Sequence, residues 1–198
     1  MWGTNARNTH PIYFHHVLKG IDNGARSWAI DPRRTATARF TDTWLGLNVG
    51  TDIGLANGVA REIISAGLTD DEFISNATTG YGEFVAFVEP WTLEHTAEVT
   101  GVSAEAIRDL AHGYATAPTA QICWTLGITE HHTGVDNVLS LCNLALLTGH
   151  VGRWGSGLVP LRGQNNVQGG GDMGALPNKL SGFQDVEDDE IRAKFEAA

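Results

Sequence analysis

Apolar side chains recur every three or four residues along several stretches of the chain, which is the spacing of one helix face. The clearest of these stretches run from Pro11 to Gly24, from Asp52 to Ala66 and from Ser103 to Tyr114. Proline is tolerated in a first helical turn, serine is a typical N-cap, and Gly67 follows the second stretch as a typical stop. These stretches are predicted to be amphipathic helices.

Between them, apolar residues form short continuous runs at 28–30, 43–50 and 119–128. Strands that read as continuous rather than alternating apolar runs are typical of a parallel sheet that is covered on both faces. The segment 134–149 is apolar on most sides and is predicted to be a buried helix. The pattern predicts an α/β fold: a Rossmann-like parallel sheet with helices on both faces, followed by a glycine-rich cofactor loop.

The remaining segments are less regular. Short helices are expected at 71–77 and 81–88, then a turn at Pro90 and another short helix, and the last fourteen residues read as a charged helix. Gly3 to Asn5 resemble a strand-to-helix turn with no strand in front of it. We therefore expect that this chain is a fragment of a longer protein.

The composition and net charge of the chain exclude some classes of binding partner. The chain has 198 residues, 42% of them hydrophobic, and a net charge of −10. This charge repels nucleic acid and anionic membranes at long range, so neither is the expected main partner. No run reaches the roughly 18 apolar residues of a membrane-spanning helix, so no direct membrane insertion is expected. Cys123 and Cys142 lie among apolar residues and are interpreted as reduced thiols, with a cytoplasmic location.

In an open parallel sheet, ligands bind beyond the carboxyl ends of the strands. Three loops are expected there, at 3–8, 31–34 and 126–132, and the loop at 50–52 could join them at another helix start. Asp31 could accept hydrogen bonds from ribose hydroxyls, or from amides of its own turn. The first loop lacks the GxGxxG spacing, which makes a nicotinamide dinucleotide unlikely at this edge.

Two further features allow more than one interpretation. His131 and His132 suggest a metal, but no third ligand stands at suitable spacing, so no metal site is predicted. Arg162 opens the stretch "RGQNNVQGGGDMG", which is rich in amides and glycines. Its guanidinium could hold a carboxylate in a bidentate fork, or cap a carbonyl at the surface. The stretch itself could be a linker, or a loop shaped around a polar ligand.

The strings "PLRGQNNVQGGGDMGALP", "WTLGITEHHTGVDNVLSLCNLALLTGHVGRWGSGL", "IDPRRTATA" and "GTNARNTHP" resemble the catalytic alpha subunit of molybdopterin-dependent formate dehydrogenases, over almost the whole chain. The resemblance implies bis(molybdopterin guanine dinucleotide) with molybdenum or tungsten, and a 4Fe-4S cluster in an upstream part. It divides this chain into a dinucleotide-binding domain at 1–157 and an active-site loop with a crossover at 158–198.

Position by position, the resemblance implies that Arg162 orients formate and that Gln164 contacts the pterin. It implies contacts with the rest of the cofactor for Asn5, Asp31, Arg33, Gly50, Asp52, Leu126, Gly127 and Glu130. Glu130 stands where the family commonly has glutamine, which puts its contact in doubt. The cysteine or selenocysteine that ligates the metal would lie upstream of Met1.

The function that follows from the resemblance is reversible oxidation of formate to carbon dioxide, with electrons passed to iron–sulfur or NAD-linked subunits. Two alternatives stay open at this point. The chain could be a stand-alone, non-catalytic module that binds molybdopterin or a guanine nucleotide, or it could belong to another molybdopterin oxidoreductase with a different substrate.

Overall fold

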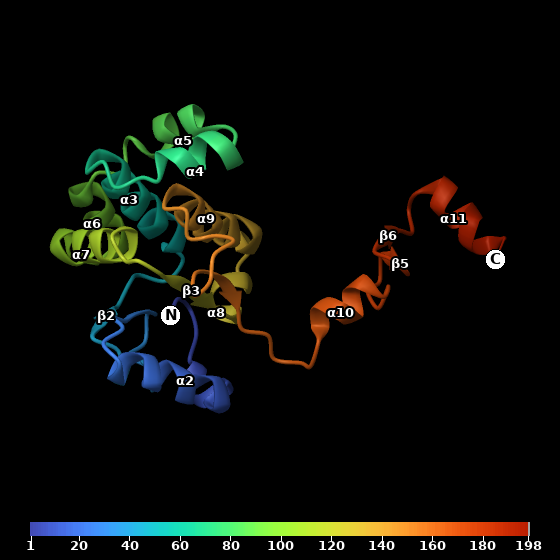
Figure 1. The fold of residues 1–198 in the computed structure, drawn as a ribbon, viewed down its shortest axis with the longest axis horizontal. Helices are drawn as coiled ribbons and strands as arrows, with labels where there is room; N and C mark the ends of the chain where they lie inside the picture. The colour runs from blue at the N-terminus through green and yellow to red at the C-terminus, as the bar shows by residue number, and fades with distance from the viewer. Residues whose placement is uncertain (198) are drawn as a thin grey trace. The chain divides into compact units, whose positions relative to one another are not determined.

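The computed structural model describes residues 1–197, which divide into two compact units, one at Met1–Leu161 and one that begins at Arg162 (Figure 1). The first unit contains strands β1 to β4 and most of the helices. Among the described residues, no helix combines the length and the apolar character that crossing a bilayer requires.

The strands of the first unit pair only in parallel. They are β1 (Trp28–Ile30) with β2 (Thr43–Leu45), and β3 (Gln121–Trp124) with β4 (Gly157–Pro160). Trp2 bridges Ile30 of β1 and Trp124 of β3, also in parallel. The amide N–H of Trp2 donates to the carbonyl of Cys123 at 2.8 Å. A single bridged residue, Trp2, thus precedes the turn at Gly3 to Asn5, and the expectation that this chain is a fragment stays a prediction.

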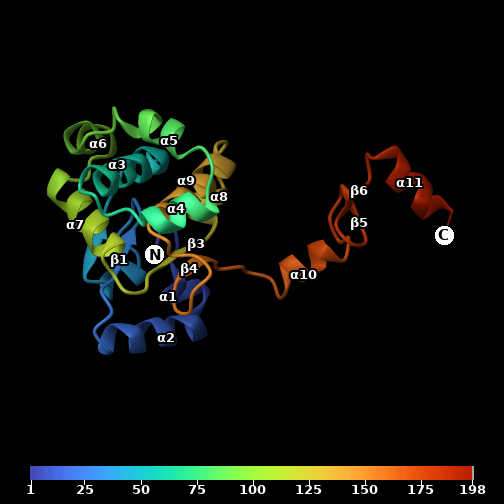
Figure 2. The same ribbon diagram turned by 45° about the horizontal axis from the view of Figure 1, so that its top comes forward.

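The first unit also contains most of the helices, which are joined by loops. They are α1 (Ala6–Thr9), α2 (Pro11–Asp22), η1 (Thr37–Arg39), α3 (Asp52–Ser65), α4 (Asp71–Ala77), α5 (Tyr81–Val88), α6 (Leu93–Thr100), α7 (Ala104–Ala115), α8 (Leu126–Thr129) and α9 (Gly134–Leu147). Figure 2 shows α2 on one side of the strands and α3 and α9 on the other. The unit is therefore a mixed α/β structure with small parallel sheets, which confirms the coarse fold class.

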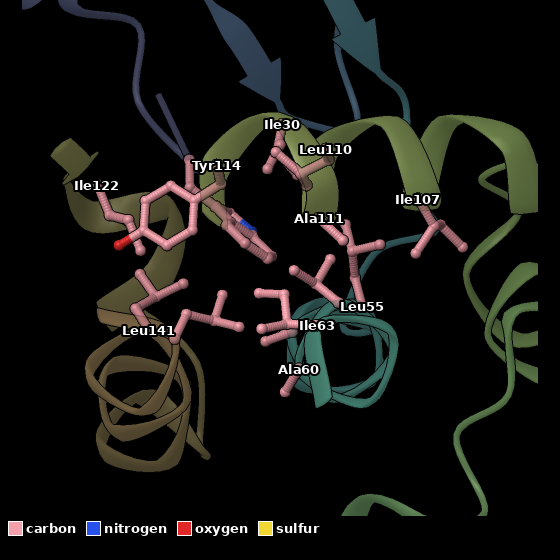
Figure 3. Packing of buried hydrophobic residues seen from close by; sticks show 14 of the residues in the cluster. Ile30, Leu55, Ala60, Ile63, Ile107, Leu110, Ala111, Tyr114, Ile122 and Leu141 are labelled. Carbon is pink, nitrogen blue, oxygen red and sulfur yellow. The ribbon is translucent and has the colours of Figure 1, made fainter. Parts of the chain in front are cut away.

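The core forms where α3, α7 and α9 pack together over the strands. Leu55 and Ile63 of α3, Ile107 of α7 and Leu141 of α9 are at most 1% exposed and point toward one another (Figure 3). Burying each such side chain stabilises the fold by about 1.5–3 kcal/mol. The 3.6-residue periodicity in the sequence thus corresponds to the real core face.

Two predicted elements are wrong in part. The strand expected at 119–128 ends at Trp124, and a short helix, α8, follows it. The helix α9 exists as expected but is not buried on most sides, since Val135 is 75% and Leu139 is 52% exposed. Apolar composition alone could not distinguish a helix that is covered on one side from one that is covered all round.

The second unit is built from α10 (Val167–Asp172), an antiparallel pair of β5 (Lys179–Leu180) with β6 (Gln184–Asp185), and α11 (Asp189–Glu196). Asn166 adopts a left-handed conformation with φ of 51°, and its side chain accepts from the amide of Gly169 at 3.3 Å. The glycine-rich loop predicted from the sequence is not confirmed, because three of its glycines lie in α10. An N-cap with this geometry offsets the low helix propensity of glycine.

Candidate functional site

The strands of the first unit end at one edge. Trp2, Ile30 and Trp124 are in parallel register, so the residues that follow them, Gly3, Asp31 and Thr125, leave on the same side. Loops at the carboxyl ends of parallel strands are the usual ligand site of such sheets. The loops of unit 1 that the sequence predicted to meet are therefore neighbours at this edge.

Gly3 and Gly127 are in direct backbone contact at this edge. The carbonyl of Gly3 accepts from the amide of Gly127 at 3.1 Å and from the Thr125 hydroxyl at 2.9 Å. A β-carbon added to Gly127 would lie 2.5 Å from the oxygen of Gly3, and one added to Gly3 would lie 2.7 Å from the carbonyl carbon of Gly127. Both positions need glycine because the backbones of α8 and the first loop are in contact. The amide of Gly127 already donates to Gly3. Leu126, at the start of α8, is 61% exposed.

Asn5 fastens the first loop to the turn that follows β1. Its Oδ1 accepts from the backbone N–H of Thr37 at 3.3 Å and from the Thr37 hydroxyl at 3.2 Å. Thr37 is fully buried, and its hydroxyl also accepts from the amide of Arg7 at 2.9 Å. Beside Asn5, the buried hydroxyl of Thr4 has no hydrogen-bond partner among the described residues. A buried hydroxyl without a partner is costly, so this corner has a polar atom to offer to a ligand.

Asp31 lies directly after β1. Its Oδ1 accepts from the backbone N–H of Arg33 at 2.8 Å, which confirms that the side chain closes its own turn. Its backbone carbonyl accepts from Nε1 of Trp44 at 2.9 Å. The Arg33 side chain is exposed. Contact of either residue with a cofactor stays a prediction.

Asp52 begins α3 and is only 8% exposed. Burial raises the pKa of its carboxyl, and the hydrogen bond from Nε1 of Trp2 at 2.8 Å, together with nearby His131, opposes that rise. The negative charge of Asp31 acts on Asp52 in the same direction as burial, so the two carboxyls are close enough to interact. Gly50 has a φ of +83° with no atom within 4 Å of a built β-carbon, so the chain turns there beside open space.

The residues at the end of α8 make mostly local contacts. Nε2 of His131 lies 2.9 Å from the carbonyl of Gly127 and is therefore its hydrogen-bond donor. The side chain of Glu130 is exposed. Within residues 1–197, no group of three or more histidine, cysteine, aspartate or glutamate side chains is arranged to hold a metal ion.

Arg162 and Gln164 belong to the second unit, and both side chains are exposed. Arg162 directly follows Leu161, whose amide donates to the carbonyl of Trp124 at 2.9 Å. The chain therefore leaves the first unit at the carboxyl end of β4, from the sheet edge described above.

His150 is a residue that the sequence did not single out. Its side chain is fully buried, with Nε2 2.9 Å from the carbonyl of Tyr114 and Nδ1 2.6 Å from Nη2 of Arg153. These contacts fix a neutral imidazole, with the proton on Nε2 and Nδ1 as acceptor, and burial lowers its pKa. No sequence signal marks it, because only tertiary packing places a histidine between these partners.

The comparison with known families decides the class of this chain. The family model described as molybdopterin oxidoreductase matches residues 1–195. The chain belongs to the molybdopterin oxidoreductase family. Its resemblance to the alpha subunits of formate dehydrogenases, expected from the sequence, is thereby supported at the level of the family.

The relatives that match this chain include proteins named formate dehydrogenase. The chain is 48% identical over 94% of its length to "F420-dependent formate dehydrogenase 2 subunit alpha" of Methanococcus maripaludis, and 43% identical over its whole length to "Formate dehydrogenase H" of Escherichia coli. It spans 28% of each of these proteins. A solved structure, "Acetylene Hydratase from Pelobacter acetylenicus", matches 78% of this chain and 21% of its own with a TM-score of 0.74 and 30% identity. The resemblance to formate dehydrogenase alpha subunits is confirmed.

Proposed function

We propose that this molybdopterin oxidoreductase chain is the cofactor- and substrate-binding part of a formate dehydrogenase, which oxidises formate to carbon dioxide at a molybdenum or tungsten centre held by bis(molybdopterin guanine dinucleotide). The observation that carries the proposal is the sheet edge of the first unit, where loops from distant parts of the sequence converge at Gly3, Asp31, Asp52 and Gly127. The choice of formate as substrate is supported by the relatives named formate dehydrogenase, which are 43–48% identical to this chain.

The residues at this edge fit a nucleotide-bearing cofactor. Thr4 offers a buried hydroxyl without a partner among residues 1–197, and Gly50 leaves open space beside the start of α3. The amino end of a helix provides backbone N–H groups and a positive dipole end, both of which suit phosphate. On the Rossmann-like reading of the sheet, the guanosine end would lie along Asp31 and Arg33, with Asn5, Gly50 and Asp52 beside the phosphates.

Near the pterin end, we assign contacts to Leu126, Gly127 and Glu130 in the first unit and to Gln164 in the second. Gly127 would contribute close backbone approach rather than its amide, which already donates to Gly3. When the cofactor is bound, its metal supplies the two-electron oxidant for formate. Iron–sulfur or NAD-linked subunits would then receive the electrons.

Arg162 has the chemistry to hold the substrate. Formate is a small anion with little surface, so a planar and permanently charged guanidinium orients it and stabilises its charge at the same time. A lysine would supply a point charge without the bidentate geometry. Arg162 follows β4 at the carboxyl end of the strands, and the proposed domain boundary after residue 157 falls within that strand.

The test is steady-state formate oxidation by the full enzyme that contains this chain, with Arg162→Ala and Arg162→Lys. By analogy with the loss of one oxyanion donor, kcat/KM should fall about 100- to 1,000-fold in the alanine variant, with partial recovery in the lysine variant. Arg192→Ala is the matched control, because Arg192 is an exposed arginine of the same unit that pairs with Asp189 on α11. Wild-type kcat/KM in Arg162→Ala with normal metal content would overturn the assignment.

A different substrate has one observation in its favour, since one of the solved structures that match is named an acetylene hydratase. That protein is 30% identical to this chain, whereas the relatives named formate dehydrogenase reach 48%. The higher identity favours formate. Turnover of another substrate by the full enzyme, with none of formate, would reverse this choice.

A further inference from the structure

Trp44 occupies an unusual position at the candidate site. It lies in the middle of β2, next to β1, and its side chain is 38% exposed although the residue is large and apolar. Its Nε1 donates to the backbone carbonyl of Asp31 at 2.9 Å. The indole is therefore anchored to the residue at which β1 ends.

The indole is also fixed by what it lies against. A β-carbon built on Gly46 would stand 2.7 Å from Cζ2 and 2.9 Å from Cη2 of Trp44. Residues two apart on a strand share a face, so the indole folds back along β2 into the space that a side chain at position 46 would fill. Gly46 has an ordinary backbone conformation rather than a left-handed one, and the close indole is what calls for glycine. Two independent constraints thus hold an exposed aromatic ring in one orientation.

Arg34 lies over this ring. Its guanidinium carbon is 6.0 Å from the indole centroid, which is the outer limit of a cation–π contact. A flat ring placed between the indole of Trp44 and the guanidinium of Arg34 needs a van der Waals contact of about 3.5–4.0 Å on each face, so the two groups must be about 7–8 Å apart. Arg34 is exposed and lies in a loop, so a shift of about 1–2 Å would open a slot of that width.

Asp31 determines which ring would suit the slot. One oxygen of its carboxylate closes the turn by accepting from Arg33, and the other accepts no hydrogen bond from the described residues. Guanine presents adjacent N1–H and amino donors on one edge, which a carboxylate oxygen can accept, whereas adenine has an acceptor at the position of N1–H. The guanidinium groups of Arg33 and Arg34 would offset the negative charge of a nucleotide in a chain of net charge −10.

We propose that Trp44 is the base platform of this site: a guanine base stacks between its indole and Arg34 while Asp31 accepts from the amino edge. This inference rests on the proposed function, since it assigns the guanine end of the cofactor to a specific side chain. Trp44 acts here as a specificity-determining residue and takes no part in the redox step.

The experiment is calorimetric titration of the whole chain with GDP, IDP and ADP. IDP lacks only the 2-amino group of GDP, so it isolates the edge that Asp31 would read. Removing an aromatic platform weakens binding of a stacked base by about 5- to 100-fold, so Trp44→Ala should lose GDP affinity by that factor. Trp44→Phe should stay within about 3-fold of wild type because a smaller π-face remains.

The matched control is Trp154→Ala, because Trp154 lies in the same unit and is 98% exposed. Its GDP affinity should equal that of wild type. Asp31→Asn should bind GDP and IDP equally, whereas wild type should prefer GDP. The thermal midpoint of each variant reports on folding separately from binding.

Equal GDP affinity in Trp44→Ala and Trp154→Ala, with both folded, overturns the platform. So does wild-type chain that binds no GDP at millimolar concentration or binds ADP equally well. In each of these cases, formate oxidation by the full enzyme with normal dependence on Arg162 would leave the proposed function standing. The two failures are therefore distinguishable.

Discussion

The contact between Gly3 and Gly127 leads to a sharp prediction for Gly127→Ala. The new β-carbon would lie 2.5 Å from the carbonyl oxygen of Gly3, whereas the usual carbon–oxygen contact is about 3.3–3.6 Å. The backbone at Gly3 must therefore retreat by about 1 Å. The same oxygen accepts from Gly127 and Thr125, so the displacement weakens two hydrogen bonds as well.

The clash and the weakened hydrogen bonds destabilise the fold, whereas the higher helix propensity of alanine stabilises it. Overpacking costs about 1–3 kcal/mol and each weakened hydrogen bond about 1 kcal/mol, while replacing glycine by alanine in a helix favours folding by at most about 1 kcal/mol. The clash and the weakened bonds together exceed the gain. We expect Gly127→Ala to lower the free energy of unfolding by about 2–4 kcal/mol.

Urea unfolding followed by tryptophan fluorescence measures this directly, since all six tryptophans lie within Met1–Leu161. Gly82→Ala is the matched control: Gly82 lies in α5, and its added β-carbon would meet no atom within 4 Å. That variant should be as stable as wild type or up to about 1 kcal/mol more stable. If Gly127→Ala is stabilised like the control, the first loop and α8 do not meet as the structure places them.

Two titratable groups give further predictions. Burial lowers the pKa of His150, so the folded state disfavours its charged form, and the free energy of unfolding should fall as pH drops below about 6.5; His150→Gln should flatten that part of a urea-unfolding series taken against pH. Burial raises the pKa of Asp52, so its negative charge destabilises the fold at neutral pH. The free energy of unfolding should therefore rise as the pH falls through the folded-state pKa of Asp52 and the carboxyl becomes neutral. Asp52→Asn should unfold at or above the wild-type urea concentration at pH 7, because it removes the buried charge while its amide oxygen still accepts from Trp2, whereas Asp52→Ala should cost about 1–3 kcal/mol. Equal stability of the two Asp52 variants would contradict the assigned hydrogen bond.

The amino-acid sequence by itself determined the elements whose signal is local. Helix α7 begins where Ser103 caps it, and α4 and α5 have the bounds that the apolar spacing predicts. The strand at Trp28–Ile30 ends before Pro32 as expected. Caps, breakers and periodicity act within a few residues, so they can be recognised without knowledge of the fold.

Only the tertiary structure decided which groups meet. No local pattern shows that Gly3 and Gly127 require glycine together, since that requirement arises from a contact between residues more than a hundred positions apart. The same holds for the burial of His150 and for the fit of the Trp44 indole over Gly46 beside Asp31. These features depend on how the parallel strands bring loops to one edge, and long-range packing of this kind is not encoded in any short stretch of residues.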